Sequence, residues 1–293
     1  MDAVITYVNG LDPVWQKDYE KHTNIPALEK RFRDWGTLKY LLRGIEKYMP
    51  FIRNVYLVVS HESQVPEWTD CNNLHIVLHK DIIPAEYLPT FNSTAIEMFL
   101  HRIEGLDEEF LYFNDDMFPV DTCKPEEFFR EGKGVIGMKK HILATGMYKK
   151  QCKNSSNFAR KALGLSSSYI FLRPQHICSP MLKSLCDELY DNYENEIKKT
   201  VTRLREEKNL NQYLYLDYMF YKGRIINENI PKKHFSLAIA SAKQIRTFLQ
   251  NPSRKMVCIN DVHLSEQKYE ELRTAIIEAF ENHFPGLSRF EKA

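Results

Sequence analysis

Short apolar runs alternate with amphipathic stretches through the first part of the chain. The runs are rich in β-branched and aromatic residues, which suit the pleated surface of a strand, and they predict strands at Ala3–Val8, Val55–Val59, Leu74–Leu78 and Phe110–Phe113. Apolar residues recur at helical spacing over Trp35–Tyr48, where Pro50 ends the pattern, and over Asn92–Ile103. This alternation of strands and helices predicts an α/β fold with a doubly wound, mostly parallel sheet.

The second half of the chain has a more helical pattern. Periodicity predicts helices over Pro180–Tyr193, Asn211–Tyr221 and Tyr269–Phe280, and Pro285-Gly286 ends the last of them. The chain has no internal repeat and no low-complexity linker, so the two halves are predicted to pack as one domain over residues 1–293.

Polar residues follow two of the predicted strands. Asn9-Gly10 comes after the first strand, and Asn114-Asp115-Asp116 comes directly after the fourth. Ligands of doubly wound sheets bind beyond the carboxyl ends of the strands. We therefore expect these two groups to meet in one crevice.

The spacing within Asn114-Asp115-Asp116 indicates a particular chemistry. Side chains alternate along an extended chain, so Asn114 and Asp116 point to the same side. This spacing resembles the D-x-D element of GT-A (Rossmann-like) glycosyltransferases, in which carboxylates hold a divalent cation on a nucleotide diphosphate. Mg²⁺ and Mn²⁺ prefer such oxygen ligands. Acidic pairs after strands also serve as turn or helix-cap residues, and the spacing alone does not separate the two interpretations.

Charge and cysteine content narrow the class of protein. The net charge is +1, which gives no general reason to expect a nucleic-acid partner. No Asp or Glu occurs between Gly132 and Cys186, a stretch that contains Lys133, Lys139, Lys140, Lys149, Lys150, Lys153, Arg160, Lys161, Arg173 and Lys183. This basic stretch is either a solvated face or a surface for a phosphate, a nucleotide or an anionic membrane.

The six cysteines are scattered without a zinc-binding pattern and indicate reduced thiols of a cytoplasmic protein. No apolar run approaches the length of about 20 residues that a transmembrane helix needs, so a soluble or peripheral protein is expected.

Four segments, in order, resemble the conserved blocks of the Stealth family. The first is Asp2–Pro13, which contains Tyr7-Val8-Asn9-Gly10. The second begins with Arg31–Val58 and runs on to Phe110–Phe118. The third is His176 with Ser179–Leu185, and the fourth is Cys258–Asp261. The family includes bacterial capsule polymerases and the catalytic part of the lysosomal-enzyme GlcNAc-1-phosphotransferase.

The resemblance implies an enzyme that transfers a sugar-1-phosphate from a UDP-sugar to a glycan hydroxyl and releases UMP. It implies a nucleotide-sugar-binding half over residues 1–130 and a mostly helical half over 131–293 that completes the active site. The expected partners are a UDP-sugar donor and a lipid-linked or growing polysaccharide acceptor, without nucleic acid. The expected location is the cytoplasm, with peripheral association at the inner face of the cytoplasmic membrane.

The resemblance also suggests roles for individual residues. Asp116 and Asn260 are the expected ligands of Mg²⁺ or Mn²⁺, although Asn260 also suits a turn. His176 is the candidate general base or phosphate donor, because the unperturbed pKa of histidine lies near physiological pH. Arg205 is the candidate clamp on the moving phosphate, with Arg203 as its rival in register.

Other residues keep two interpretations. Glu97 is either a sugar-binding or metal-orienting carboxylate or a structural partner of Arg102 or Arg43. Arg33, Asp34 and Arg43 are candidates for binding the diphosphate or for bracing the loop. The expected nucleotide- and substrate-binding residues also include Asp2, Asn9, Gly10, Asn92 and Asp115.

Two positions depart from the family pattern: Thr37 stands where Glu is usual, and Gly44 replaces a usual Ser. Both are candidates for influencing which sugar is bound. Two other functions compete with the sugar-1-phosphate transferase. One is a glycosyltransferase that moves the sugar alone and releases UDP, and the other is a binding subunit without activity.

Overall fold

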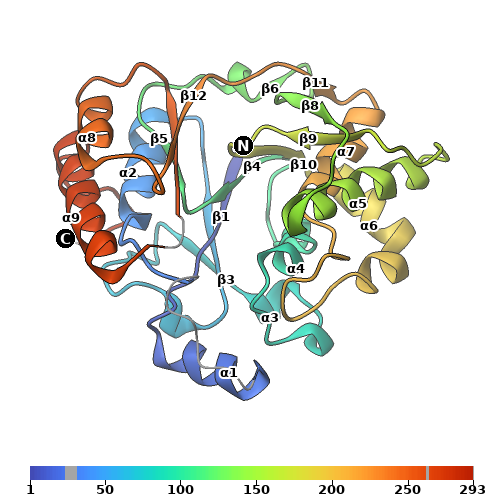
Figure 1. The fold of residues 1–293 in the computed structure, drawn as a ribbon, viewed down its shortest axis with the longest axis horizontal. Helices are drawn as coiled ribbons and strands as arrows, with labels where there is room; N and C mark the ends of the chain where they lie inside the picture. Colours follow the sequence, from blue (N-terminus) through green and yellow to red (C-terminus); the bar gives the residue numbers. More distant parts are fainter. Residues whose placement is uncertain (24–31, 262–263, 293) are drawn as a thin grey trace. The chain divides into compact units, whose positions relative to one another are not determined.

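The computed structural model describes residues 1–23, 32–261 and 264–292. Its largest sheet has five strands in the order β10-β4-β1-β2-β3 (Figure 1). The strands are β1 (Asp2–Thr6), β2 (Val55–Val59), β3 (His75–Leu78), β4 (Glu109–Asn114) and β10 (Ser179–Leu182). The sheet is mixed and mostly parallel, with β10 antiparallel to β4 at one edge. The predicted α/β class is therefore confirmed.

The smaller sheets join strands that the sequence pattern did not predict. They have the orders β12-β13-β5, β11-β7-β6 and β8-β9. Their strands are β5 (Met117–Pro119), β6 (Phe129–Arg130), β7 (Lys133–Val135), β8 (Met138–His141), β9 (Phe171–Pro174), β11 (Ile225–Ile226), β12 (Lys232–Ser236) and β13 (Met256–Asn260).

The longest helices lie in the second half of the chain, as predicted. The helices are α1 (Pro13–Thr23), α2 (Leu38–Tyr48), α3 (His79–Ile82), α4 (Ser93–Glu97), α5 (Gly146–Ala162), α6 (Lys183–Lys198), α7 (Tyr213–Tyr221), α8 (Ala242–Gln250) and α9 (Glu266–His283). Short 3-10 turns occur at Glu62–Gln64, Ala85–Tyr87, Leu100–Arg102 and Pro125–Glu127. Among the described residues, no helix combines the length and apolar character needed to span a bilayer.

Two predicted helices differ from the observed elements. The helix expected from Pro180 begins only at Lys183, because Ser179–Leu182 pairs with β4 as the edge strand β10. An edge position tolerates Pro180, which has no N–H to donate. The helix expected over Asn92–Ile103 ends at Glu97, where the carbonyl of Met98 accepts a hydrogen bond from the Tyr215 hydroxyl at 2.7 Å.

The chain forms two compact units, each made of several segments. Unit 1 comprises Met1–Val4, Val77–Tyr112 and Pro125–Ile230, and unit 2 comprises Ile5–Ile76, Phe113–Lys124 and Pro231–Ala293. Helices α5 and α7 pack together in unit 1, whereas α8 packs on α9 in unit 2 (Figure 1).

Gly44 lies where α2 packs most closely on β5 in unit 2. A Cβ atom at this position would lie 2.5 Å from the Pro119 carbonyl oxygen and 3.3 Å from Cζ of Phe284. No larger side chain fits without a backbone shift. Helix–strand packing therefore accounts for glycine at this position, where the family pattern has serine.

We expect Gly44→Ser to destabilise the fold by about 1–3 kcal/mol, the usual cost of overpacking, although glycine is the poorer helix former. Urea unfolding measures the change. Lys47→Ser on the exposed face of the same helix is the control, and it is expected to cost about 0.5 kcal/mol or less. An equal loss in both variants would contradict the packing explanation.

Candidate functional site

The antiparallel pairing of β5 with β13 builds the acidic part of unit 2. Cys258 pairs with Met117, and the backbone N–H of Ile259 donates to the carbonyl of Asp116 at 2.9 Å. Asp116 immediately precedes β5, and Asn260 ends β13. The pairing thus places Asp116 beside the strand that carries Cys258 and Asn260, which are far away in the sequence.

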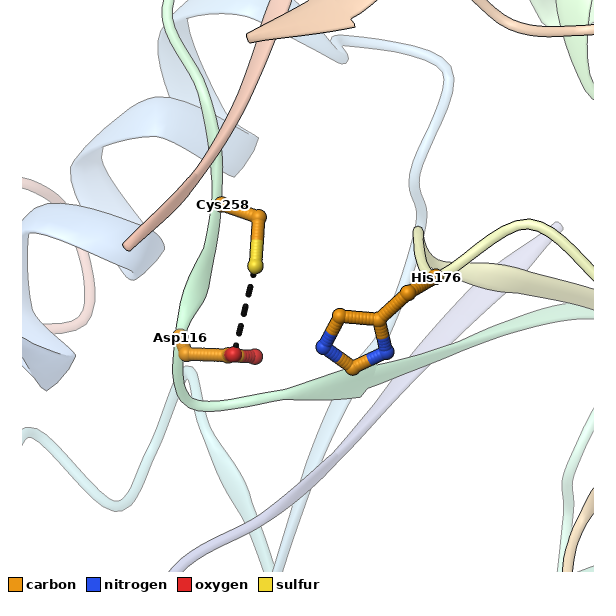
Figure 2. A group of neighbouring side chains, drawn as sticks. All are labelled: Asp116, His176 and Cys258. Atoms are coloured by element: carbon orange, nitrogen blue, oxygen red, sulfur yellow. Dashed lines mark hydrogen bonds between the residues drawn. The ribbon is translucent and has the colours of Figure 1, made fainter. Parts of the chain in front are cut away.

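The Asp116 carboxylate is held by a thiol. Cys258 is 1% exposed, and its Sγ donates to Oδ2 of Asp116 at 3.3 Å (Figure 2). Burial, and after it the charge of Asp116, raises the pKa of this thiol above its ordinary value. Cys258 is therefore a neutral hydrogen-bond donor that orients the carboxylate.

Several more acidic groups of unit 2 face the same region. The Tyr7 hydroxyl bonds the Asp34 carboxylate, and burial together with the charges of Asp34 and Asp115 raises the tyrosine pKa. Asp115 in turn interacts electrostatically with Asp116, Asp34 and Asp261. Four carboxylates from three segments thus interact around Asp115, and we name Asp34, Asp115, Asp116 and Asp261 the carboxylate group.

Repulsion between neighbouring carboxylates shifts the pKa of Asp115. Its pKa is raised to about 7, first by burial among protein atoms and then by Asp116, Asp34 and Asp261. Because the Asp115 side chain is exposed to solvent, we attribute this raised pKa more to repulsion by the neighbouring carboxylates than to burial. Concentrated negative charge of this kind favours the binding of a cation.

The loop after β1 is held in place by the 3-10 turn after β2. The side chain of Asn9 accepts from Leu11 N at 2.9 Å, and Gln64 bonds both the N–H and the carbonyl of Asn9. Gly10 has no room for a side chain, because a Cβ would lie 2.4 Å from the Phe32 carbonyl oxygen. The loop is rigid at the carboxyl end of β1, where a ligand was expected.

Two candidate arginines of unit 2, Arg33 and Arg43, are engaged in packing. Arg43 donates from Nε and Nη2 to the two carboxylate oxygens of Glu291 at 2.8 and 2.7 Å, and from Nη1 to the Phe284 carbonyl at 2.9 Å. Arg33 lies 4.2 Å from the Tyr269 ring centroid and bonds Glu266. These contacts match the bracing role that the sequence left open, and they leave Arg43 little capacity to bind a diphosphate.

A second polar cluster lies inside unit 1, around Glu97. The Glu97 carboxylate is 6% exposed and accepts from Gln212 N at 2.7 Å. Burial raises its pKa to about 7, while the Gln212 bond and the Arg205 charge oppose that shift. Arg205 also bonds the Ser93 hydroxyl. The charge partner of Glu97 is therefore Arg205 and neither Arg102 nor Arg43.

The neighbours of Arg205 act as braces. Asn92 caps α4 through Thr94 N at 3.1 Å, and its amide nitrogen donates to the Thr202 carbonyl at 3.0 Å and to Oδ1 of Asn209 at 3.1 Å. Arg203 donates to the Leu88 carbonyl at 3.0 Å. The amide of Asn92, which was expected to bind substrate, thus bonds the loop that carries Arg205. Arg203 bonds Leu88 instead, so Arg205 rather than Arg203 is the partner of Glu97.

Two further expected residues belong to unit 1. Asp2 is buried at the start of β1 and accepts from Asp107 N at 3.0 Å. Asp2 lies at the amino end of β1, whereas Asn9 and Gly10 follow its carboxyl end. This placement does not support a shared role of the three residues at the uridine. His176 lies between β9 and β10 in unit 1.

Sequence reasoning assigned no role to Cys258, Tyr7 or Asp261. For Cys258 the sequence held a signal, because residues two apart in a strand share a face and Cys258 lies two residues before Asn260. Tyr7 and Asp261 acquire their importance from carboxylates in other segments, which no local pattern reveals. Arg31, where the second resembling block begins, lies outside the described residues.

Replacing Arg43 tests its bracing role. We expect Arg43→Ala to destabilise the protein by about 3–5 kcal/mol in urea unfolding, because Glu291, at 4% side-chain exposure, loses its buried partner. Arg254→Ala, an exposed arginine, should change stability by about 0.5 kcal/mol or less. Normal stability combined with lost nucleotide affinity would instead assign Arg43 to the ligand.

The raised pKa of Glu97 predicts a pH-dependent stability. The folded carboxyl holds its proton up to pH about 7, above its ordinary 4.5, so the free energy of unfolding should fall as pH rises between these values. The loss is at most about 3 kcal/mol. Glu97→Gln keeps the acceptor for Gln212 and should remove this component in urea unfolding from pH 5 to 8. Glu126→Gln, an exposed control, should leave the profile unchanged; an identical profile in Glu97→Gln would refute the assignment.

Comparisons with known proteins give the chain its relatives. The profile of Stealth protein conserved region 2 matches residues 31–136. The receptor polysaccharide phosphotransferase WefC of Streptococcus oralis is 30% identical over 99% of this chain and 99% of its own length. The capsular polysaccharide phosphotransferase WcwK of Streptococcus pneumoniae is 30% identical over 100% of this chain and 99% of its own length.

A more distant relative and a solved structure extend the comparison. The exopolysaccharide phosphotransferase cps2G of Lactiplantibacillus plantarum is 26% identical over 100% of this chain and 96% of its own length. The crystal structure of the galactosyltransferase LgtC aligns with 99% of this chain and 98% of its own at 11% identity and a TM-score of 0.41. The full-length identity with WefC and WcwK, together with the conserved-region match, establishes that the chain belongs to the Stealth family.

Proposed function

We propose that this chain is a sugar-1-phosphate transferase of bacterial cell-surface polysaccharide synthesis. It takes a sugar-1-phosphate, of a hexose or an N-acetylhexosamine, from a UDP-sugar and joins it to a hydroxyl of a glycan acceptor. The observation that carries the proposal is the full-length identity of 30% with proteins named polysaccharide phosphotransferases. The acidic region of unit 2 supports it, because carboxylates can hold a divalent cation, and such a cation would neutralise the charge of a nucleotide diphosphate.

The donor atoms of unit 2 suit a hard divalent cation. Asp116 and Asn260 supply oxygens on paired segments, and the carboxylate group surrounds them with negative charge. Cys258 offers its thiol as a hydrogen-bond donor, which favours Mg²⁺ or Mn²⁺ over a sulfur-seeking metal. We assign Asp116 and Asn260 as the ligands. The cation, when bound, neutralises diphosphate oxygens as charge develops on them.

The reaction transfers a phosphoryl group between oxygens. The acceptor hydroxyl attacks the sugar-proximal phosphorus, a new P–O bond forms, and the bond from that phosphorus to the bridging oxygen breaks, so UMP leaves with that oxygen. We assign His176 to take the hydroxyl proton. Arg205, which Ser93 and Glu97 hold in place in unit 1, is assigned to the charge on the phosphoryl oxygens.

The remaining assignments concern substrate and location. The rigid loop of Asn9 and Gly10 is assigned to the uridine side, and Asp34 and Asp115 to orientation of the diphosphate end. Glu97 is assigned to holding Arg205 and the donor sugar. The acceptor is a lipid-linked or growing polysaccharide, so the enzyme works in the cytoplasm at the inner face of the membrane.

The fate of the donor's β-phosphate tests the reaction. With a UDP-sugar labelled in that phosphate and supplied with Mg²⁺ or Mn²⁺, we expect label in the acceptor and release of unlabelled UMP. Release of labelled UDP, with unlabelled sugar on the acceptor, would identify a glycosyltransferase and overturn the proposal. No turnover across a panel of UDP-sugars and acceptors would favour a binding protein.

Asp116→Asn tests the cation assignment. We expect kcat/KM to fall about 100-fold or more, because a ligand of the cation loses its charge, while unfolding by urea changes little. Asp121→Asn, five residues on and exposed, is the matched control and should keep wild-type turnover. Wild-type activity of Asp116→Asn at limiting Mg²⁺ would exclude Asp116 as a ligand.

A further inference from the structure

Exposed apolar side chains concentrate in one part of unit 1. Ile142 and Leu143 are 67% and 72% exposed, and Tyr169 and Ile170 are 83% and 47% exposed. Met147, at the start of α5, is 40% exposed. We name these five residues the apolar tip. Single exposed apolar residues are common on protein surfaces, but a cluster of five such residues indicates an interaction surface.

Strand pairing brings the two halves of the apolar tip together. Strands β8 and β9 are antiparallel, and His141 pairs with Phe171 at the end of the ladder. Ile142 continues β8 beyond this pair, and Ile170 precedes Phe171 on β9. Leu143 and Tyr169 are one residue further along each strand. All four side chains therefore lie at the same open end of the β8–β9 pair.

The strands behind the apolar tip carry unbalanced positive charge. Lys139 pairs directly with Arg173 across the ladder, an arrangement in which like charges destabilise the folded sheet. The pKa of His141 is lowered by burial first and then by Arg173, Lys149 and Lys139. In the described part of the chain, Lys139, Lys140 and Lys149 make no salt bridge, whereas Lys150 pairs with Glu207. An anionic partner would relieve this repulsion.

We propose that the apolar tip and the lysines behind it are a docking surface for an anionic phospholipid membrane. Apolar side chains at the end of a rigid strand pair can enter the acyl boundary, while Lys139, Lys140, Lys149 and Arg173 contact phosphate head groups. The absence of Asp and Glu from residues 132–186 keeps the whole surface attractive to anionic lipid. This partner extends the proposed function, on which its biological purpose rests, because a lipid-linked acceptor is presented at such a surface.

Vesicle sedimentation of the full chain tests the docking surface. Wild-type protein should bind mixed phosphatidylcholine–phosphatidylglycerol vesicles, with binding that weakens as salt is raised, and should bind phosphatidylcholine alone much less. The double variant Ile142→Ser/Leu143→Ser should lower the partition coefficient about tenfold or more, as should Lys139→Glu/Lys140→Glu. Thermal unfolding checks that both variants remain folded.

Matched controls separate the docking surface from general surface properties. Ile239→Ser removes an apolar side chain of 87% exposure in unit 2, and Lys243→Glu reverses an exposed charge there. Both should bind vesicles like the wild type. In Leu143→Trp, tryptophan fluorescence should shift to shorter wavelength with anionic vesicles, which reports insertion of the side chain.

Three outcomes would overturn the docking surface: no binding of the wild type to anionic vesicles, unchanged binding of the Ile142/Leu143 variant, or an equal loss in Ile239→Ser. Light scattering tests a different occupant. If the Ile142/Leu143 variant turns a dimer into a monomer while vesicle binding stays unchanged, the surface joins two copies of the chain, and the membrane proposal fails.

The experiment also distinguishes this inference from the proposed function. Vesicle binding is measured without donor or acceptor, so it does not depend on turnover. With a soluble acceptor fragment, the Ile142→Ser/Leu143→Ser and Lys139→Glu/Lys140→Glu variants should both keep wild-type sugar-1-phosphate transfer. Vesicle binding without any transfer would leave the docking surface standing and remove the proposed function, whereas transfer without vesicle binding would do the reverse.

Discussion

The pairing of β5 with β13 is the contact on which the acidic part of the molecule depends. It joins Asp116 to the segment of Cys258 and Asn260, and the Cys258 thiol then orients the carboxylate. The same arrangement places Asp116 among carboxylates that repel one another and raise the pKa of Asp115. Packing elsewhere in unit 2 must hold these charges together, because a group of carboxylates disfavours its own assembly in the absence of a cation.

Much of unit 2 supplies that support. Arg43 bridges α2 to the end of the chain through Glu291 and Phe284, and Gly44, its neighbour on the helix, lets α2 approach the carbonyl of Pro119 at the end of β5. Both residues belong to a block that resembles the Stealth family. The contacts of Arg43 show that similarity within such a block reflects packing as well as chemistry, whereas Gly44 departs from the family pattern because α2 packs closely on β5 in this chain.

In unit 1 the contacts show which arginine is the partner of Glu97. Glu97 and Arg205 lie far apart in the sequence but interact, and the amide of Asn92 fixes the loop that carries Arg205. Arg203 has a bracing contact with Leu88, which separates it from Arg205 although the two residues are neighbours in the sequence. A buried glutamate with a pKa near 7 and a half-buried arginine held by its neighbours form a polar centre in unit 1, whose interior also holds buried polar side chains such as Asn211 and Asp217.

The sequence by itself determined the α/β class, most of the strands of the main sheet and the helices α7 and α9, because period and composition act over neighbouring residues. Family resemblance also singled out Asp116, Glu97, Arg205 and Asn260 as candidate site residues, and their roles stay predictions. Tertiary structure decided that Pro180 lies in an edge strand, that the helix from Asn92 stops at Glu97, and that Arg43 is a brace. These outcomes depend on partners that are distant along the chain, such as Tyr215 for Met98 and Glu291 for Arg43, and a local pattern carries no information about them.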